Sequence, residues 1–137
     1  MIVARFGLLA IAALVGVAFG LRYLTARAWT SYHAAVAGRG WEDLDPNLQA
    51  IVLGLVRIAG GCFLTLGFAI GFLTLAWAGG AAWAPWAILT ITATGLGPAF
   101  VTAIKLRDIR PDAGAPVLPA LLAFGLVIAG TAIASLG

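Results

Sequence analysis

Two sets of polar side chains in this chain have the types and spacing to take part in binding or catalysis. The first set places the phenol of Tyr32 and the imidazole of His33 a short way before the indole of Trp41. Arg57 joins this set as a lone guanidinium within a long apolar run. Together these groups could hold the polar end of a ligand, or serve an enzyme that acts on it. The simpler interpretation, in which they make only local hydrogen bonds, is favoured over both.

The second set is a row of threonines at a regular spacing of four residues, at positions 90, 94 and 102, with Pro98 filling the gap. Residues four apart lie on one face of a helix, so the row could form the polar wall of a ligand cavity. Alternatively, each threonine hydroxyl bonds back to a carbonyl of its own helix, and this second interpretation is favoured. The ligand-binding candidates are therefore Arg57, Tyr32, His33, Trp41, Thr90, Thr94 and Thr102.

The remaining sequence counts against several kinds of site. All five acidic residues lie outside the apolar runs, at Glu42, Asp43, Asp45, Asp108 and Asp112. This placement counts against proton- or sodium-coupled transport, because a carboxylate within the membrane is the usual carrier. His33 is the only histidine, which excludes a bis-histidine haem or a histidine-rich metal site within one chain. With no phosphate-binding glycine motif and no nucleophile elbow, we predict no catalytic residue, no metal and no cofactor, and an enzyme is not favoured.

The composition is that of a membrane protein. Of the 137 residues, 63% are hydrophobic and 9% are charged, and the mean hydropathy is +1.08. A chain of this length forms one domain, and it cannot hide so much apolar surface in a soluble core. The single cysteine, Cys62, leaves no possibility of an intrachain disulfide.

Four apolar segments, at residues 2–22, 57–78, 83–104 and 117–136, can each cross the membrane as a helix. About 20 apolar residues are needed to cross roughly 30 Å of hydrocarbon. We therefore predict an all-α membrane protein, a four-transmembrane-helix bundle formed by residues 1–137 as a single domain.

The first segment has a second interpretation. Arg5, the apolar run and the small residues at 25–28 also fit a secretory signal. The run is long for a signal, however, and Ala12, Gly16 and Gly20 form a small-residue stripe typical of helix packing. A membrane-spanning helix is therefore favoured.

The basic residues gather on one side of the predicted bundle. The opposite side has only Arg5. Six basic residues lie in the connections after the first and third segments, at Arg22, Arg27, Arg39, Lys105, Arg107 and Arg110. Because basic residues are enriched in cytoplasmic connections, we predict that both termini lie outside the cytoplasm. The same six residues are candidates for contacts with lipid headgroups, and nucleic acid is not an expected partner.

The second helix is predicted to be longer than the membrane is thick. Asp45 can cap free backbone amides and Pro46 suits the first helical position, so the helix should run from Pro46 to Ala78. These 33 residues span about 50 Å. Counted back from Trp77 at one interface, about 20 residues end at Arg57, which is therefore expected at the cytoplasmic boundary. The alternative is a charge held inside the membrane for a function.

Residues 46–56 would then lie beyond the hydrocarbon, although several of them are apolar. Residues 25–37 have a helix-compatible composition and end at Gly38, a residue suited to a helix C-cap. We therefore expect helices 1 and 2 to be extended on the cytoplasmic side and to pair as a hairpin over about residues 23–56.

A weak internal repeat relates the second segment to the fourth. A shift of 70 residues aligns eight identities in 22 positions, including Pro46 with Pro116 and Gly60 with Gly130. If the repeat is genuine, the bundle consists of two parallel helical hairpins.

Several short motifs resemble those of known membrane proteins. In Tyr32-His33-Ala34-Ala35, Trp41-Glu42-Asp43-Leu44, Pro46, Gln49, and Arg57 followed by Gly60-Gly61, the chain resembles a group of small bacterial four-helix membrane proteins. More distantly, it is similar to the DoxX-like proteins in Arg57 to Gly61, followed by Leu64 and Gly67, and in the connection from Arg107 to Pro116. The resemblance implies a bacterial inner membrane location and assigns no catalytic residue. Some DoxX-like proteins are similar to subunits of membrane redox complexes.

Three functions remain open. The favoured one is an accessory or structural subunit that packs against a larger membrane complex through exposed small residues such as Gly67 and Gly71. The alternative is binding or transport of a lipid, a quinone or another apolar molecule, in a cavity lined by the threonine row and Arg57. The least favoured is an enzyme that uses the first set on a lipid substrate. The expected partners are membrane lipids and either a membrane protein or further copies of this chain.

Overall fold

The computed structural model describes residues 2–114 and 116–136, with side chains from Phe6 onward. This part of the chain is helical and contains no strand. Its elements are α1 (Ile2–Leu24), α2 (Ser31–Ala37), η1 (Trp41–Asp43), α3 (Pro46–Ala78), α4 (Ala84–Ile109), η2 (Pro111–Ala113) and α5 (Val117–Leu136). Helices α1, α3, α4 and α5 are long and apolar enough to cross a membrane, which confirms the predicted fold class.

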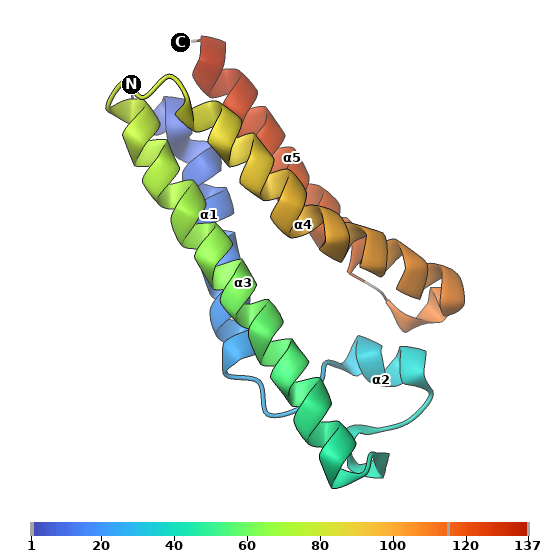
Figure 1. Ribbon diagram of the computed structural model, residues 1–137. Helices are drawn as coiled ribbons and strands as arrows, with labels where there is room; N and C mark the ends of the chain where they lie inside the picture. Colours follow the sequence, from blue (N-terminus) through green and yellow to red (C-terminus); the bar gives the residue numbers. More distant parts are fainter. Residues whose placement is uncertain (1, 115, 137) are drawn as a thin grey trace.

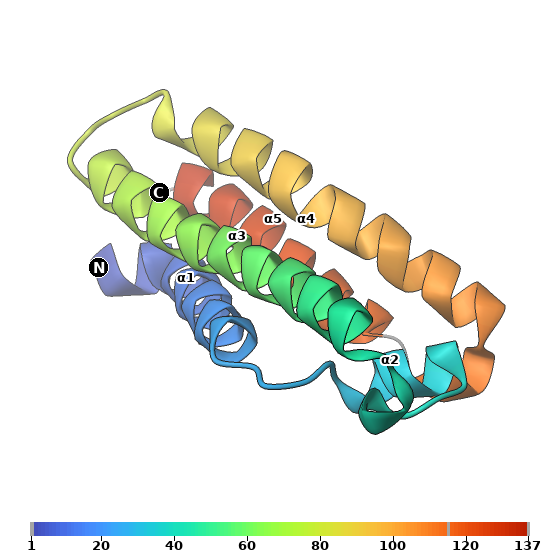
Figure 2. The same ribbon diagram turned by 60° about the horizontal axis from the view of Figure 1, so that its bottom comes forward.

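The four long helices form a ring in which each one contacts two others. Helices α1 and α3 form one hairpin and α4 and α5 the other, and α1 also packs on α5 while α3 packs on α4 (Figures 1 and 2). We call the end with the connection at residues 79–83 the turn end and the opposite end the α2 end. Helices α3 and α4 lie together near the turn end and diverge toward the α2 end (Figure 1).

The two helices of the first hairpin approach each other backbone to backbone. A Cβ atom placed on Gly67 would lie 2.6 Å from the backbone nitrogen of Val17, and one placed on Gly20 would lie 2.5 Å from that of Leu64. Gly16 lies against Gly67 in the same interface. The packing role predicted for the small-residue stripe of α1 is confirmed.

The densest part of the core lies toward the turn end. Each long helix contributes a large, nearly inaccessible side chain to the core: Leu9, Ile70, Ile88 and Val127. The ring of Trp77 packs edge-on against that of Phe6, with centroids 5.4 Å apart. Trp77 is therefore partly a core residue, whereas the neighbouring Trp83 and Trp86 are exposed.

Helix α3 begins as the sequence predicts. The Asp45 carboxylate accepts hydrogen bonds from the backbone amides of Asn47 and Leu48, both at 3.0 Å, and Pro46 follows the cap. The side chain of Gln49 donates to the carbonyls of Trp41 and Leu44. These bonds attach the 3₁₀ turn η1 to the first turn of the long helix.

The predicted extension of helix 1 is wrong. Helix α1 ends at Leu24, residues 25–30 are not helical, and α2 is a separate helix capped by Gly38 at a φ of 69°. Instead of running along residues 46–56, α2 crosses beneath the bundle and contacts η2 (Figure 2). Two interactions favour this path. The Thr25 hydroxyl donates to the Leu21 carbonyl at the helix end, and the rings that follow become partly buried beneath the bundle.

The glycine packing of the first hairpin can be tested within α3. A methyl group at Gly67 meets backbone atoms of α1, which cannot move aside, whereas a methyl group at Gly61 meets no atom within 4 Å. We expect Gly67→Ala to lower the free energy of unfolding by about 1–3 kcal/mol. The control Gly61→Ala should raise it, by up to about 1 kcal/mol, because alanine favours helix. Unfolding in detergent, followed by circular dichroism, measures both, and equal stabilities would contradict the packing described here.

Candidate ligand cavity

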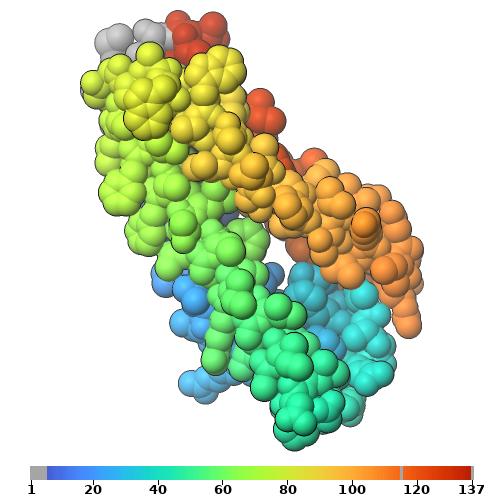
Figure 3. Space-filling view, in the orientation of Figure 1, coloured from blue at the N-terminus to red at the C-terminus, as the bar shows by residue number. Residues whose placement is uncertain are grey.

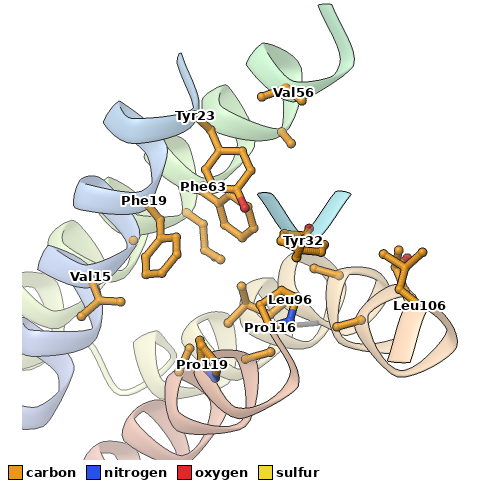
Figure 4. Close-up of a pocket in the computed structure, with 18 of the residues that line it drawn as sticks. Val15, Phe19, Tyr23, Tyr32, Val56, Phe63, Leu96, Leu106, Pro116 and Pro119 are labelled. Carbon is orange, nitrogen blue, oxygen red and sulfur yellow. The ribbon is translucent and has the colours of Figure 1, made fainter. Parts of the chain in front are cut away.

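The divergence of α3 from α4 leaves a cavity of about 460 Å³ inside the bundle. All four long helices contribute to its wall, and the segment from Trp29 to His33 closes it at the α2 end (Figure 4). Cavities of this size are typical of sites for small molecules. The labelled lining residues in Figure 4 are Val15, Phe19, Tyr23, Tyr32, Val56, Phe63, Leu96, Leu106, Pro116 and Pro119.

The cavity is elongated along the bundle. Its lining residues on α3 run from Val52 to Ile70, which is about 27 Å of helix at 1.5 Å per residue. The space-filling view shows a hollow between α3 and α4, bounded below by α2 (Figure 3). An elongated cavity of this kind suits a ligand with a long hydrocarbon chain better than a compact ligand.

Aromatic polar residues gather at the α2 end of this cavity. The ring centroids of Tyr32 and His33 lie 3.9 Å apart, and the Trp29 ring stacks at 6.5 Å from that of His33. The hydroxyl of Thr30 and Nδ1 of His33 are hydrogen-bonded at 2.8 Å, which fixes the orientation of the imidazole. Tyr23, at the end of α1, brings a second phenol to the same place (Figure 4).

One polar atom of this cluster has no partner. The indole Nε1 of Trp29 is buried and makes no hydrogen bond within the described part of the chain. A buried donor without an acceptor costs about 1–3 kcal/mol. An indole can only donate, so whatever satisfies this atom must accept a hydrogen bond.

The cluster carries no charge at neutral pH. Burial raises the pKa of Tyr32 above its ordinary value of 10.0, and the electrostatic effect of the nearby Tyr23 phenol raises it further. Burial lowers the pKa of His33 below 6.5. No Asp, Glu, Lys or Arg is found among the described residues that line the cavity. The polar end therefore offers hydrogen bonds without an ionic group.

The structure separates the residues of the first predicted set. Tyr32 and His33 line the cavity. The rings of Trp41 and Trp29 pack in a T-shaped arrangement, with centroids 5.9 Å apart, but Trp41 lies outside the cavity wall. Arg57 is exposed on α3 and also lies outside the wall. Its neighbour Gly60 packs against the end of α1, so Arg57 lies just past the level where that helix stops.

The threonine row faces mostly away from the cavity. The hydroxyls of Thr90, Thr94 and Thr102 are bonded to carbonyls of α4, at 2.8–2.9 Å. This is the local bonding favoured from the sequence. Only Thr102 of the three borders the cavity, near its α2 end.

The six basic candidates for lipid contacts are exposed and lie at or near the α2 end of the bundle: Arg22, Arg27, Arg39, Lys105, Arg107 and Arg110. Arg107 forms an exposed ion pair with Asp108 at 3.3 Å. Arg22 lines a second hollow of about 250 Å³, which shares Tyr23, Trp29 and Val56 with the main cavity. Arg5 lies outside the residues whose side chains are described.

Two residues of the site, Tyr23 and Trp29, were not among the ligand-binding candidates predicted from the sequence. The only sign in the sequence was that both residues lie close to Tyr32 and His33 in the chain. The residue spacing did not predict that the segment after α1 would turn beneath the bundle. The described residues contain no group of three His, Cys, Asp or Glu side chains that could hold a metal ion.

The burial of His33 predicts that the stability of the folded protein depends on pH. The folded protein binds a proton at His33 less readily than the unfolded chain does, because the pKa of this residue is lowered by burial. Below about pH 6.5 the unfolded chain therefore takes up more protons, and stability should fall as the pH falls.

His33→Asn, which keeps a hydrogen-bonding atom near Thr30, should lose this part of the pH dependence. Unfolding measured between pH 5 and 8 tests this expectation, with the exposed Ser31→Ala as control. If His33→Asn and the unaltered protein have the same pH profile, His33 is not the group responsible.

Comparisons of the chain with family models, with curated proteins and with solved structures found no match.

Proposed function

We propose that this protein binds an apolar molecule, such as a lipid or a quinone, in the cavity between its membrane-spanning helices. The observation that carries the proposal is the cavity itself, about 460 Å³ in volume, elongated, lined largely by apolar side chains and polar at one end. Ligand sites typically combine such an apolar wall with a few convergent polar groups. Binding of the molecule and its transport across the membrane would both use this cavity.

A ligand would reach the cavity from the bilayer. The hollow between α3 and α4 faces outward from the bundle, where lipid surrounds a membrane protein (Figure 3). The basic residues near the α2 end support a cytoplasmic location for this end, in a bacterial inner membrane with both termini outside. In that orientation the polar end of the cavity lies near the headgroups of the cytoplasmic leaflet.

The alternative, an accessory or structural subunit of a larger membrane complex, has less support. It requires a free face of small residues on α3, but Gly67 is buried against α1 and Gly71 lies 3.8 Å, measured from an added Cβ, from Ala13. The exposed face of α3 instead carries large side chains such as Phe68 and Phe72, which lipid can cover. A partner or a second copy would appear as added mass after gentle detergent extraction.

Filling the cavity should remove the bound molecule. Ala123 lines the cavity from α5, whereas Ala129 on the same helix is exposed. After gentle extraction, mass spectrometry should find an apolar molecule with the unaltered protein and with Ala129→Phe, and several-fold less with Ala123→Phe. Equal retention by the two variants would remove the support for this proposal.

Arg57 should not take part in this binding. It is exposed and lies outside the cavity wall, so Arg57→Leu should retain as much of the bound molecule as the unaltered protein. The same mass measurement gives the result. A loss of retention as large as that of Ala123→Phe would instead place the guanidinium in the binding site.

A further inference from the structure

The chain of a bound lipid cannot by itself explain selective binding. A hydrocarbon chain in the bilayer is already in an apolar environment, so its entry into an apolar cavity gains little hydrophobic free energy. Selectivity must therefore come from shape and from the polar end of the cavity. The chemistry of that end defines the class of molecule that it can hold.

The polar end of the cavity presents hydrogen-bond donors. The buried Nε1 of Trp29 has no partner in the described part of the chain. The phenols of Tyr23 and Tyr32 belong to residues that line this end, and each phenol can donate one hydrogen.

The same end has no group that would stabilise a charged head. The described residues of the cavity wall include no ionisable side chain other than Tyr23, Tyr32 and His33, and His33 is held neutral by burial. Moving a carboxylate or a phosphate into such surroundings is costly unless a cation accompanies it. Arg22 lines the second hollow and not this cavity.

We propose that the head of the bound molecule is an uncharged hydrogen-bond acceptor, an ester, ketone or quinone carbonyl, held at the phenols of Tyr23 and Tyr32. This inference rests on the proposed function and adds the chemical class of the ligand. The carbonyl oxygen has two lone pairs, so it can accept from both phenols together. The chain of the ligand extends along α3 toward Leu66 and Ile70, which line the far part of the cavity.

The experiment compares four probes with the same chain length and different heads. The probes are hexadecane, methyl palmitate, palmitate and hexadecyl phosphate, each added to the full-length protein in nanodiscs of neutral lipid. Bound probe is measured by mass spectrometry after competition with deuterated methyl palmitate. One net hydrogen bond corresponds to about tenfold in affinity, so methyl palmitate should bind about tenfold more tightly than hexadecane and more tightly than either anion.

Removal of the donors should abolish this preference without closing the cavity. In the double variant Tyr23→Phe, Tyr32→Phe, both rings remain while both phenol donors are lost. Methyl palmitate should then bind about as weakly as hexadecane, and circular dichroism of the variant shows that it is folded. The control is Trp86→Phe, at an exposed position near the turn end.

Failure of this inference differs from failure of the proposed function. If palmitate or hexadecyl phosphate binds most tightly, or if all four probes bind equally and are all displaced by Ala123→Phe, the cavity binds apolar chains but the assigned head class is wrong. If no probe shows binding that is sensitive to Ala123→Phe, the proposed function itself is overturned.

Discussion

The close contact between the backbones of α1 and α3 is the constraint on which the rest of the structure depends. Gly16, Gly20 and Gly67 allow the two helices to approach until no side chain separates them. This first hairpin is therefore tightly closed along its shared length. The second hairpin joins it through large core side chains near the turn end, where Leu9 and Ile88 are fully buried. The cavity lies where that core ends and α3 and α4 diverge.

The element that closes the cavity is the one least able to fold alone. Helix α2 has seven residues, well below the length at which an isolated helix is stable in water. It is held by the rings of Trp29, Tyr32 and His33 and by its contact with η2. The residues that form the polar end of the site are thus the same residues that keep this wall in place.

Features set by local chemistry could be predicted from the sequence. The four spans, the Asp45 cap and the glycine stripe each depend on residue types within one helix or one pair of helices. The end of α1 and the path of α2 could not be predicted, because they depend on burial of Trp29 and Tyr32 by helices distant in sequence. For the same reason the threonine spacing showed a shared face on α4 but not that Thr90 and Thr94 would face outward.

The uncharged wall of the cavity has an electrical consequence. A membrane potential of 100 mV contributes about 2.3 kcal/mol for each elementary charge that crosses it. The described residues of this wall carry no ionic group at neutral pH, and the ligand class assigned to it carries none either. Entry, occupancy and exit would then proceed equally in an energised and a de-energised cell, so concentration in the bilayer, and not voltage, would govern how full the site is.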